Sequence, residues 1–110
     1  MWLFTTQGFY SVVAHRNDAA KVIVRARARE DLEALKNQIP SLRIFEDAEA
    51  DYRYRAVVDH EKWVAAVAIL AAGIDYPNFK SAVAERQGID RERVYMRVWA
   101  EMLGIQEGAE

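Results

Sequence analysis

Side-chain alternation in two segments constrains the fold of this chain more than any other feature. The segments are Lys21 to Arg27 (KVIVRAR) and Tyr52 to Val58 (YRYRAVV), which are rich in the β-branched and aromatic residues that strands favour. Phe9 to His15 (FYSVVAH) has the same character, and Arg16-Asn17-Asp18 after it supplies turn residues. The chain must therefore form a sheet, and apolar residues elsewhere must cover one side of it.

Helical spacing appears between and after these strands. One helix is predicted over residues 28–39, closed by Pro40, and a second follows Asp59 as its N-cap. Their apolar positions are Leu32, Leu35 and Ile39 in the first and Trp63, Val67, Leu70 and Ile74 in the second. Two further helices are predicted, from about Phe79 to Gln87 and from Asp90 to near Gly104, with Gly88 ending the first of them.

The order of elements predicts an α+β fold. Leu42 to Phe45 reads as a short strand, and Met1 to Thr5 as a further one, with Gly8 marking a turn or bulge. Strand–strand–helix–strand–strand–helix is a permuted ferredoxin-like order with C-terminal helices, a mainly antiparallel sheet and helices on one face. It places Tyr52–Val58 between Lys21–Arg27 and Leu42–Phe45. Residues 1–105 are predicted to form a single domain and 106–110 a frayed tail.

Composition excludes several classes of site. The 110 residues include no Cys, so there is no disulfide, thiolate zinc site, iron–sulfur cluster or thiol nucleophile. The net charge of -2 argues against bulk attraction to nucleic acid but leaves room for a local basic patch. The longest apolar run, Trp63 to Ile74, is about half the roughly 20 residues that span a bilayer. We therefore expect a cytoplasmic protein without a membrane partner.

Strand alternation predicts one candidate site. If the small apolar residues of the two central strands face the helices, the intervening arginines face away. These arginines are Arg25, Arg27, Arg53 and Arg55, and Ser11, Val13, His15, Arg43 and Phe45 join them from the outer strands. Guanidinium groups match phosphate or carboxylate, so this face could hold a nucleotide or single-stranded nucleic acid. The aromatic signature of common RNA-binding sheets is absent.

The same face also suits a protein partner. Arginine is common in interfaces, and mixed surfaces containing Val13, Ile23 and Val57 tend to be covered. A homodimer is predicted, because a domain of this size has difficulty burying all of its large apolar side chains. These include Trp2, Phe4, Trp63 and Trp99.

A second candidate lies in the turn from Ile74 to Lys80. Asp75 and Lys80 could hold a polar ligand with Tyr76 as acid or donor, and a small enzyme would place them beside the arginines in one pocket. The structural alternative is that Asp75 or Asn78 caps a helix while the aromatic rings fill the core.

No catalytic motif is recognisable. GxxxxGK[ST], GxGxxG, GxSxG and HExxH are all missing, and His15 and His60 lie on different elements. The sequence therefore predicts no catalytic residue, no metal site and no cofactor.

Several stretches resemble a family of small uncharacterised bacterial proteins. They are Met1-Trp2-Leu3-Phe4-Thr5, Gly8-Phe9, Ser11-Val12-Val13, Val24 to Arg27, Asp51-Tyr52, Tyr54-Arg55 and the turn Ile74-Asp75-Tyr76 with Asn78-Phe79-Lys80. The resemblance implies a bacterial protein and supplies no activity. The function predicted from the residues is a non-catalytic binding module for an anionic ligand, with an interaction subunit or a small enzyme as alternatives.

Overall fold

The computed structural model describes residues 1–108, and the chain divides into two units, Met1–Asp75 and Tyr76–Glu110. The first unit holds the sheet and two helices, and the second holds two more helices. In chain order the elements are β1 (Trp2–Phe4), β2 (Phe9–Ala14), β3 (Lys21–Ala26), α1 (Arg29–Leu35), β4 (Phe45–Glu46), β5 (Tyr54–Asp59), α2 (His60–Ala72), α3 (Phe79–Gln87) and α4 (Ile89–Gln106). The predicted α+β class is confirmed.

The sheet has five antiparallel strands in the order β1-β2-β3-β5-β4. The longer predicted strands, β2, β3 and β5, lie side by side, and β4 pairs with the outer side of β5 as expected. The ferredoxin-like arrangement is not confirmed by this order, because β1 adds an edge strand beyond β2 and β4 has only two residues.

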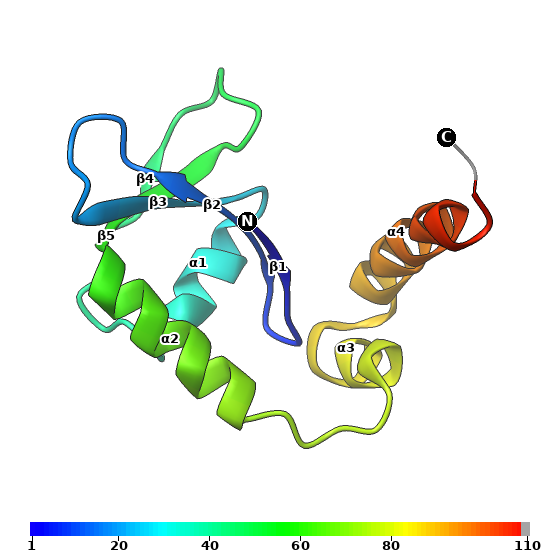
Figure 1. Ribbon diagram of the computed structural model, residues 1–110. Helices are drawn as coiled ribbons and strands as arrows, with labels where there is room; N and C mark the ends of the chain where they lie inside the picture. Colours follow the sequence, from blue (N-terminus) through cyan, green and yellow to red (C-terminus); the bar gives the residue numbers. More distant parts are fainter. Residues whose placement is uncertain (109–110) are drawn as a thin grey trace. The chain divides into compact units, whose positions relative to one another are not determined.

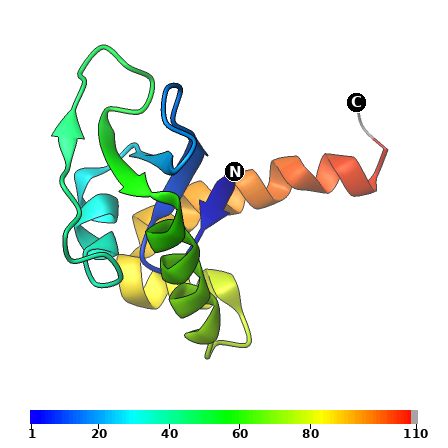
Figure 2. The same ribbon diagram turned by 60° about the vertical axis from the view of Figure 1, so that its left-hand side comes forward.

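One face of the sheet carries the core. Val24 pairs with Val12 on one side and with Ala56 on the other, and all three side chains are buried. Leu32 and Leu35 of α1, with Trp63 and Ala66 of α2, join the same buried cluster. Both helices therefore cover one face of the sheet, as predicted (Figure 1). β5 runs directly into α2, which fixes where that helix starts (Figure 2).

Several predicted boundaries were wrong. The strand predicted from Tyr52 begins at Tyr54, the one predicted over Leu42–Phe45 shrinks to Phe45–Glu46, and α1 ends at Leu35. Ile39 is nevertheless buried, because the turns that follow α1 return it to the core. Asp59 occupies the N-cap position of α2, but its side chain makes no capping bond and instead accepts a 2.8 Å hydrogen bond from Lys21.

A buried carboxylate ties α1 to the start of β2. Asp31 is 3% exposed, and its Oδ2 accepts a 3.0 Å hydrogen bond from the backbone N–H of Phe9. The hydroxyl of Tyr10 donates to the backbone carbonyl of Asp31 at 2.7 Å. These bonds hold the N-terminal hairpin against the helical layer.

The second unit is a pair of helices joined by Gly88. Asn78 caps α3 by accepting a 2.9 Å hydrogen bond from the N–H of Ser81, and Phe79 stacks on Tyr95 of α4 at 5.9 Å between ring centroids. Gly88 has a φ of 99°, a left-handed conformation that glycine adopts without strain. The single domain predicted for residues 1–105 stays a prediction. Of the predicted tail, Gln106 ends α4 and residues 109–110 lie outside the described part of the chain.

Across residues 1–108, none of the helices combines the length and the apolar character that crossing a bilayer requires.

Candidate functional site

The sheet has a second face, opposite α1 and α2, that we call the distal face. Its centre is a row of directly paired residues that crosses all the strands: Trp2, Ser11, Arg25, Arg55 and Phe45. Paired residues of antiparallel strands point to the same side, so this cross-strand row lies on one surface. Two arginines stand at its middle and an aromatic residue stands at each end.

Arg25 is anchored by β2. Its Nη2 donates a 2.6 Å hydrogen bond to Oγ of Ser11, a residue that is 1% exposed, and its Nε lies 3.4 Å from the carbonyl oxygen of Ser11. The guanidinium is thus held across the strand pair in a fixed position. The bonded atoms are Nε and Nη2, and Nη1 makes no hydrogen bond within residues 1–108.

Tyr52 gathers two of the arginines. The Cζ atoms of Arg25 and Arg27 lie 4.7 Å and 4.4 Å from the centroid of its ring, distances typical of cation–π contacts. Alternation continued back from β5 would turn the Tyr52 ring toward the helices, but its contacts with Arg25 and Arg27 place it on the distal side. Because it precedes β5 rather than lying in it, strand alternation does not determine its direction, and its ring also lies 6.4 Å from that of Phe9.

The segment Asp51–Tyr52 also holds Arg55. Nε of Arg55 donates to the carbonyl oxygen of Tyr52 at 3.1 Å, and Nη2 lies 3.6 Å from Oδ1 of Asp51. Arg27 donates to the carbonyl oxygen of Asp51 at 2.9 Å. Three guanidinium groups therefore converge on two consecutive residues.

Arg53 is paired with an acid instead of with Asp51–Tyr52. Its Nε and Nη2 each lie 2.8 Å from Oε2 of Glu46, and this hydrogen-bonded ion pair raises the pKa of the Arg53 guanidinium above its ordinary value. Of the four arginines predicted to share a site, the structure brings Arg25, Arg27 and Arg55 together and pairs Arg53 with an acid.

The distal face is locally cationic. Asp51 is the carboxylate near the three converging arginines, and its side chain is 70% exposed. Within the described residues neither Arg25 nor Arg27 belongs to an ion pair. Such a group can bind a phosphate or carboxylate through charge-assisted, forked hydrogen bonds.

Aromatic side chains flank the arginines. Trp2 is 66% exposed and Phe45 is 47% exposed. Phe9 supports the β1 end, because it stacks on Phe4 at 4.4 Å and meets Trp2 at 5.9 Å with perpendicular ring planes. We did not assign Trp2 to this face from the sequence. The pairing of Trp2 with Ser11 across the first hairpin is the signal that would have placed it there.

The turn candidate is divided between the two units. Asp75 ends the first unit and Tyr76 begins the second. Lys80 lies 4.6 Å above the ring of Trp99, and Arg86 lies 5.7 Å from the ring of Tyr76. Asn78 is the capping residue, as the structural alternative required. The enzyme hypothesis, which needs Asp75, Tyr76 and Lys80 beside the sheet arginines, stays a prediction.

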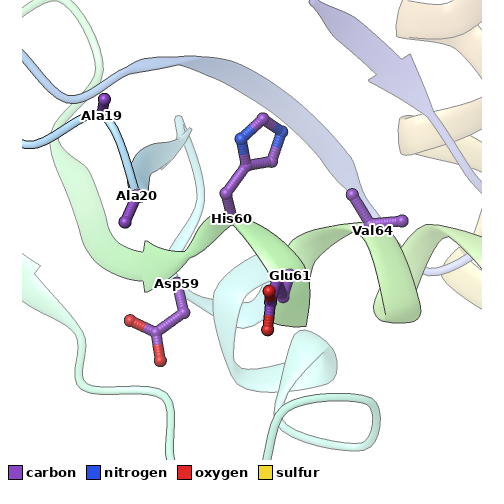
Figure 3. Close-up of a pocket in the computed structure, with 6 residues that line it drawn as sticks. All are labelled: Ala19, Ala20, Asp59, His60, Glu61 and Val64. Atoms are coloured by element: carbon purple, nitrogen blue, oxygen red, sulfur yellow. The ribbon is translucent and has the colours of Figure 1, made fainter.

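An open hollow lies at the start of α2 (Figure 3). It is lined by Ala19, Ala20, Asp59, His60, Glu61 and Val64, and His60 and Asp59 point to different sides. A second hollow is lined by both histidines, His15 and His60. Over residues 1–108 no group of three or more His, Asp or Glu side chains is placed to hold a metal ion.

Comparison of the chain with protein-family models, with curated proteins and with solved structures gave no match.

Proposed function

We propose that the distal face is a non-catalytic binding site for a phosphate-bearing ligand, either a nucleotide or a single-stranded nucleic acid. The observation that carries this proposal is the convergence of Arg25, Arg27 and Arg55 on Tyr52, with the exposed carboxylate of Asp51 beside Arg55. Guanidinium groups form forked, charge-assisted hydrogen bonds with phosphate oxygens. Their anchoring to Ser11 and to backbone carbonyls reduces the entropy that a ligand must remove on binding.

The test compares two arginines that pair differently. In Arg25→Gln, we expect the affinity for inorganic pyrophosphate and for AMP, measured by isothermal titration calorimetry, to fall at least tenfold. Arg53→Gln removes the same charge from the residue that precedes β5, but Glu46 already neutralises that charge. It should change the affinity less than threefold. Circular dichroism verifies that both variants are folded.

Equal losses in the two variants would show that the effect is general electrostatics rather than a site. No binding of either phosphate compound to the wild-type chain would reject the proposal. Arg25→Lys separates the contribution of the positive charge from that of the forked hydrogen bonds, because lysine keeps the charge but lacks the planar guanidinium.

A second candidate function is an oligomerisation or protein-interaction subunit. It is favoured by the exposure of Val13 and Val57, which form an apolar row with Ile23 beside the arginines. A homodimer through this face would appear in sedimentation velocity as a concentration-dependent dimer that Val57→Asp dissociates. A chain that is still monomeric at about 100 μM would contradict it, because a dimer with a dissociation constant well below that concentration would be almost fully formed.

We also propose that unit Met1–Asp75 is a permuted ferredoxin-like fold extended by β1. The relative order of β2, β3, β5 and β4, with α1 after β3 and α2 after β5, supports this assignment.

A further inference from the structure

We infer that the ligand of the distal face is a single-stranded nucleic acid of about four or more nucleotides, lying across the strands along the cross-strand row. This inference rests on the proposed function and names its ligand more narrowly. In this arrangement one base stacks on Trp2, another stacks on Phe45, and the phosphates between them lie over Arg25 and Arg55.

The length of the row excludes a mononucleotide as the full ligand. Trp2 and Phe45 are on the two edge strands, β1 and β4, and three strands lie between them. Neighbouring strands are about 4.8 Å apart, so the ends of the row are separated by about 19 Å. A single nucleotide has one base and cannot cover both rings. A strand of about four nucleotides, at the lower end of the site sizes of single-strand-binding folds, can do so.

The two rings have the exposure that stacking requires. Trp2 and Phe45 are both exposed at the ends of the row, so a base can reach each ring. Trp2 meets Phe9 with an interplanar angle of 87°, so these two rings do not stack face to face. Stacking on an aromatic side chain tolerates any base, and it changes affinity from about fivefold to more than a hundredfold per base.

The charges on the row and beside it, where Arg27 follows β3, match a polyanion. Arg25, Arg27 and Arg55 supply three positive charges, and Nη1 of Arg25 makes no hydrogen bond within the described residues. The next row along the strands on the same face is apolar: Val13, Ile23 and Val57. A single strand presents phosphates and unpaired bases side by side, whereas a duplex hides its bases. The alternation of a charged row with an apolar one therefore favours a single strand.

The experiment measures affinity against strand length. Fluorescein-labelled oligothymidylates and oligouridylates of two, four, six and eight nucleotides are titrated with the full chain, and binding is followed by anisotropy. We expect at least a tenfold gain in affinity between two and six nucleotides and then a plateau. The logarithm of the association constant should fall with the logarithm of the salt concentration with a slope of about −2. Each phosphate that an arginine neutralises on a single strand contributes about −0.7 to this slope, and three arginines are involved.

Aromatic variants separate the inference from the proposed function. Trp2→Ala and Phe45→Ala should each weaken binding of the six-nucleotide strands at least fivefold and leave pyrophosphate binding unchanged. Trp2→Phe, which keeps a flat ring, should retain most of the affinity that Trp2→Ala loses, whereas Trp2→Leu should bind as weakly as Trp2→Ala. Trp99→Ala is the matched control, because Trp99 is 54% exposed on α4 and is outside the cross-strand row.

Each alternative outcome has a distinct meaning. Pyrophosphate binding without any gain from longer strands would overturn the inference and leave the proposed function standing. Duplexes that bind as tightly as single strands would also overturn it. Failure of both pyrophosphate and oligonucleotides to bind would reject the proposed function itself, and self-association that competes with the strands would point to a second copy of the chain as the occupant.

Discussion

At residue 8 the backbone of the N-terminal hairpin passes directly over the side chain of Asp31. A Cβ atom on Gly8 would lie 2.8 Å from both Cβ and Cγ of Asp31, a separation that real structures do not show. Gly8→Ala must therefore shift the hairpin or α1 and strain the bond between Asp31 and the N–H of Phe9. We expect a loss of about 1–3 kcal/mol in the free energy of unfolding, measured with urea.

Gly73→Ala is the control for this substitution. The nearest atoms to a Cβ there are the carbonyl oxygens of Ile69 and Leu70 at 3.5 Å and 3.6 Å, which are ordinary contacts. The free energy of unfolding should change by less than about 0.5 kcal/mol. A comparable loss in both variants would mean that the contact with Asp31 is not the cause, because the lower entropy of the unfolded chain alone would make Gly73→Ala slightly stabilising.

Asp59 titrates below its ordinary range. The hydrogen bond from Lys21 and the charge of that ammonium group lower the pKa of Asp59, and the same pair raises the pKa of Lys21. A carboxyl whose pKa is lower in the folded chain stabilises it above the unfolded value of about 3.9, and this contribution is lost as pH falls through the folded pKa. In Lys21→Gln, a carboxyl NMR titration should show the pKa of Asp59 rising toward its ordinary value.

Lys62→Gln is the comparison for that titration. Nζ of Lys62 lies 3.9 Å from Oδ2 of Asp59, beyond hydrogen-bond distance, and its effect on the pKa of Asp59 is the smaller one. The pKa of Asp59 should therefore move less than in Lys21→Gln. An equal movement would show that distance-insensitive charge effects, and not the hydrogen bond, hold the carboxyl in its ionised form.

At the scale of elements, the cap of α3 is a local feature that the sequence indicates well. The side chain of Asn78 accepts from the N–H of Ser81, one of the backbone donors that a helix start leaves unbonded. Asn78→Ala should cost about 1 kcal/mol in helix stability, seen as faster amide exchange over α3. Ser81→Ala keeps the backbone donor and should leave amide exchange over α3 unchanged. If exchange becomes as fast in Ser81→Ala as in Asn78→Ala, the loss of the capping bond does not explain the faster exchange.

Strand alternation predicted the faces of β3 and β5 because both strands are regular and paired along their full length. Val22, Val24 and Ala26 are buried where the pattern required it. Alternation misled at Tyr52, which precedes its strand, and it could not show that Asp31 accepts a bond from Phe9, 22 residues away. Local sequence determines the period of an element, whereas loop directions and buried polar partners depend on contacts between distant segments.

At the scale of the whole molecule, net charge is a poor guide to binding. The chain has 15 basic and 17 acidic residues, yet its cations and anions are not evenly mixed. Pairs such as Lys21–Asp59 and Arg53–Glu46 neutralise each other locally, while Arg25 and Arg27 lie against the ring of Tyr52. A ligand within a Debye length of about 8 Å senses the arginines rather than the total charge.

The division of the chain into two units leads to a prediction about a fragment. The members of the core cluster lie between Tyr10 and Ala66, and the proposed anion-binding arginines belong to the same unit. A chain that ends at Asp75 is therefore expected to unfold cooperatively in urea, followed by circular dichroism, and to bind pyrophosphate within threefold of the full chain. Many domains of about 55–65 residues fold alone, so the fragment is long enough. An unfolded fragment would instead support one domain over residues 1–105, and a folded fragment without affinity would show that the site needs residues beyond Asp75.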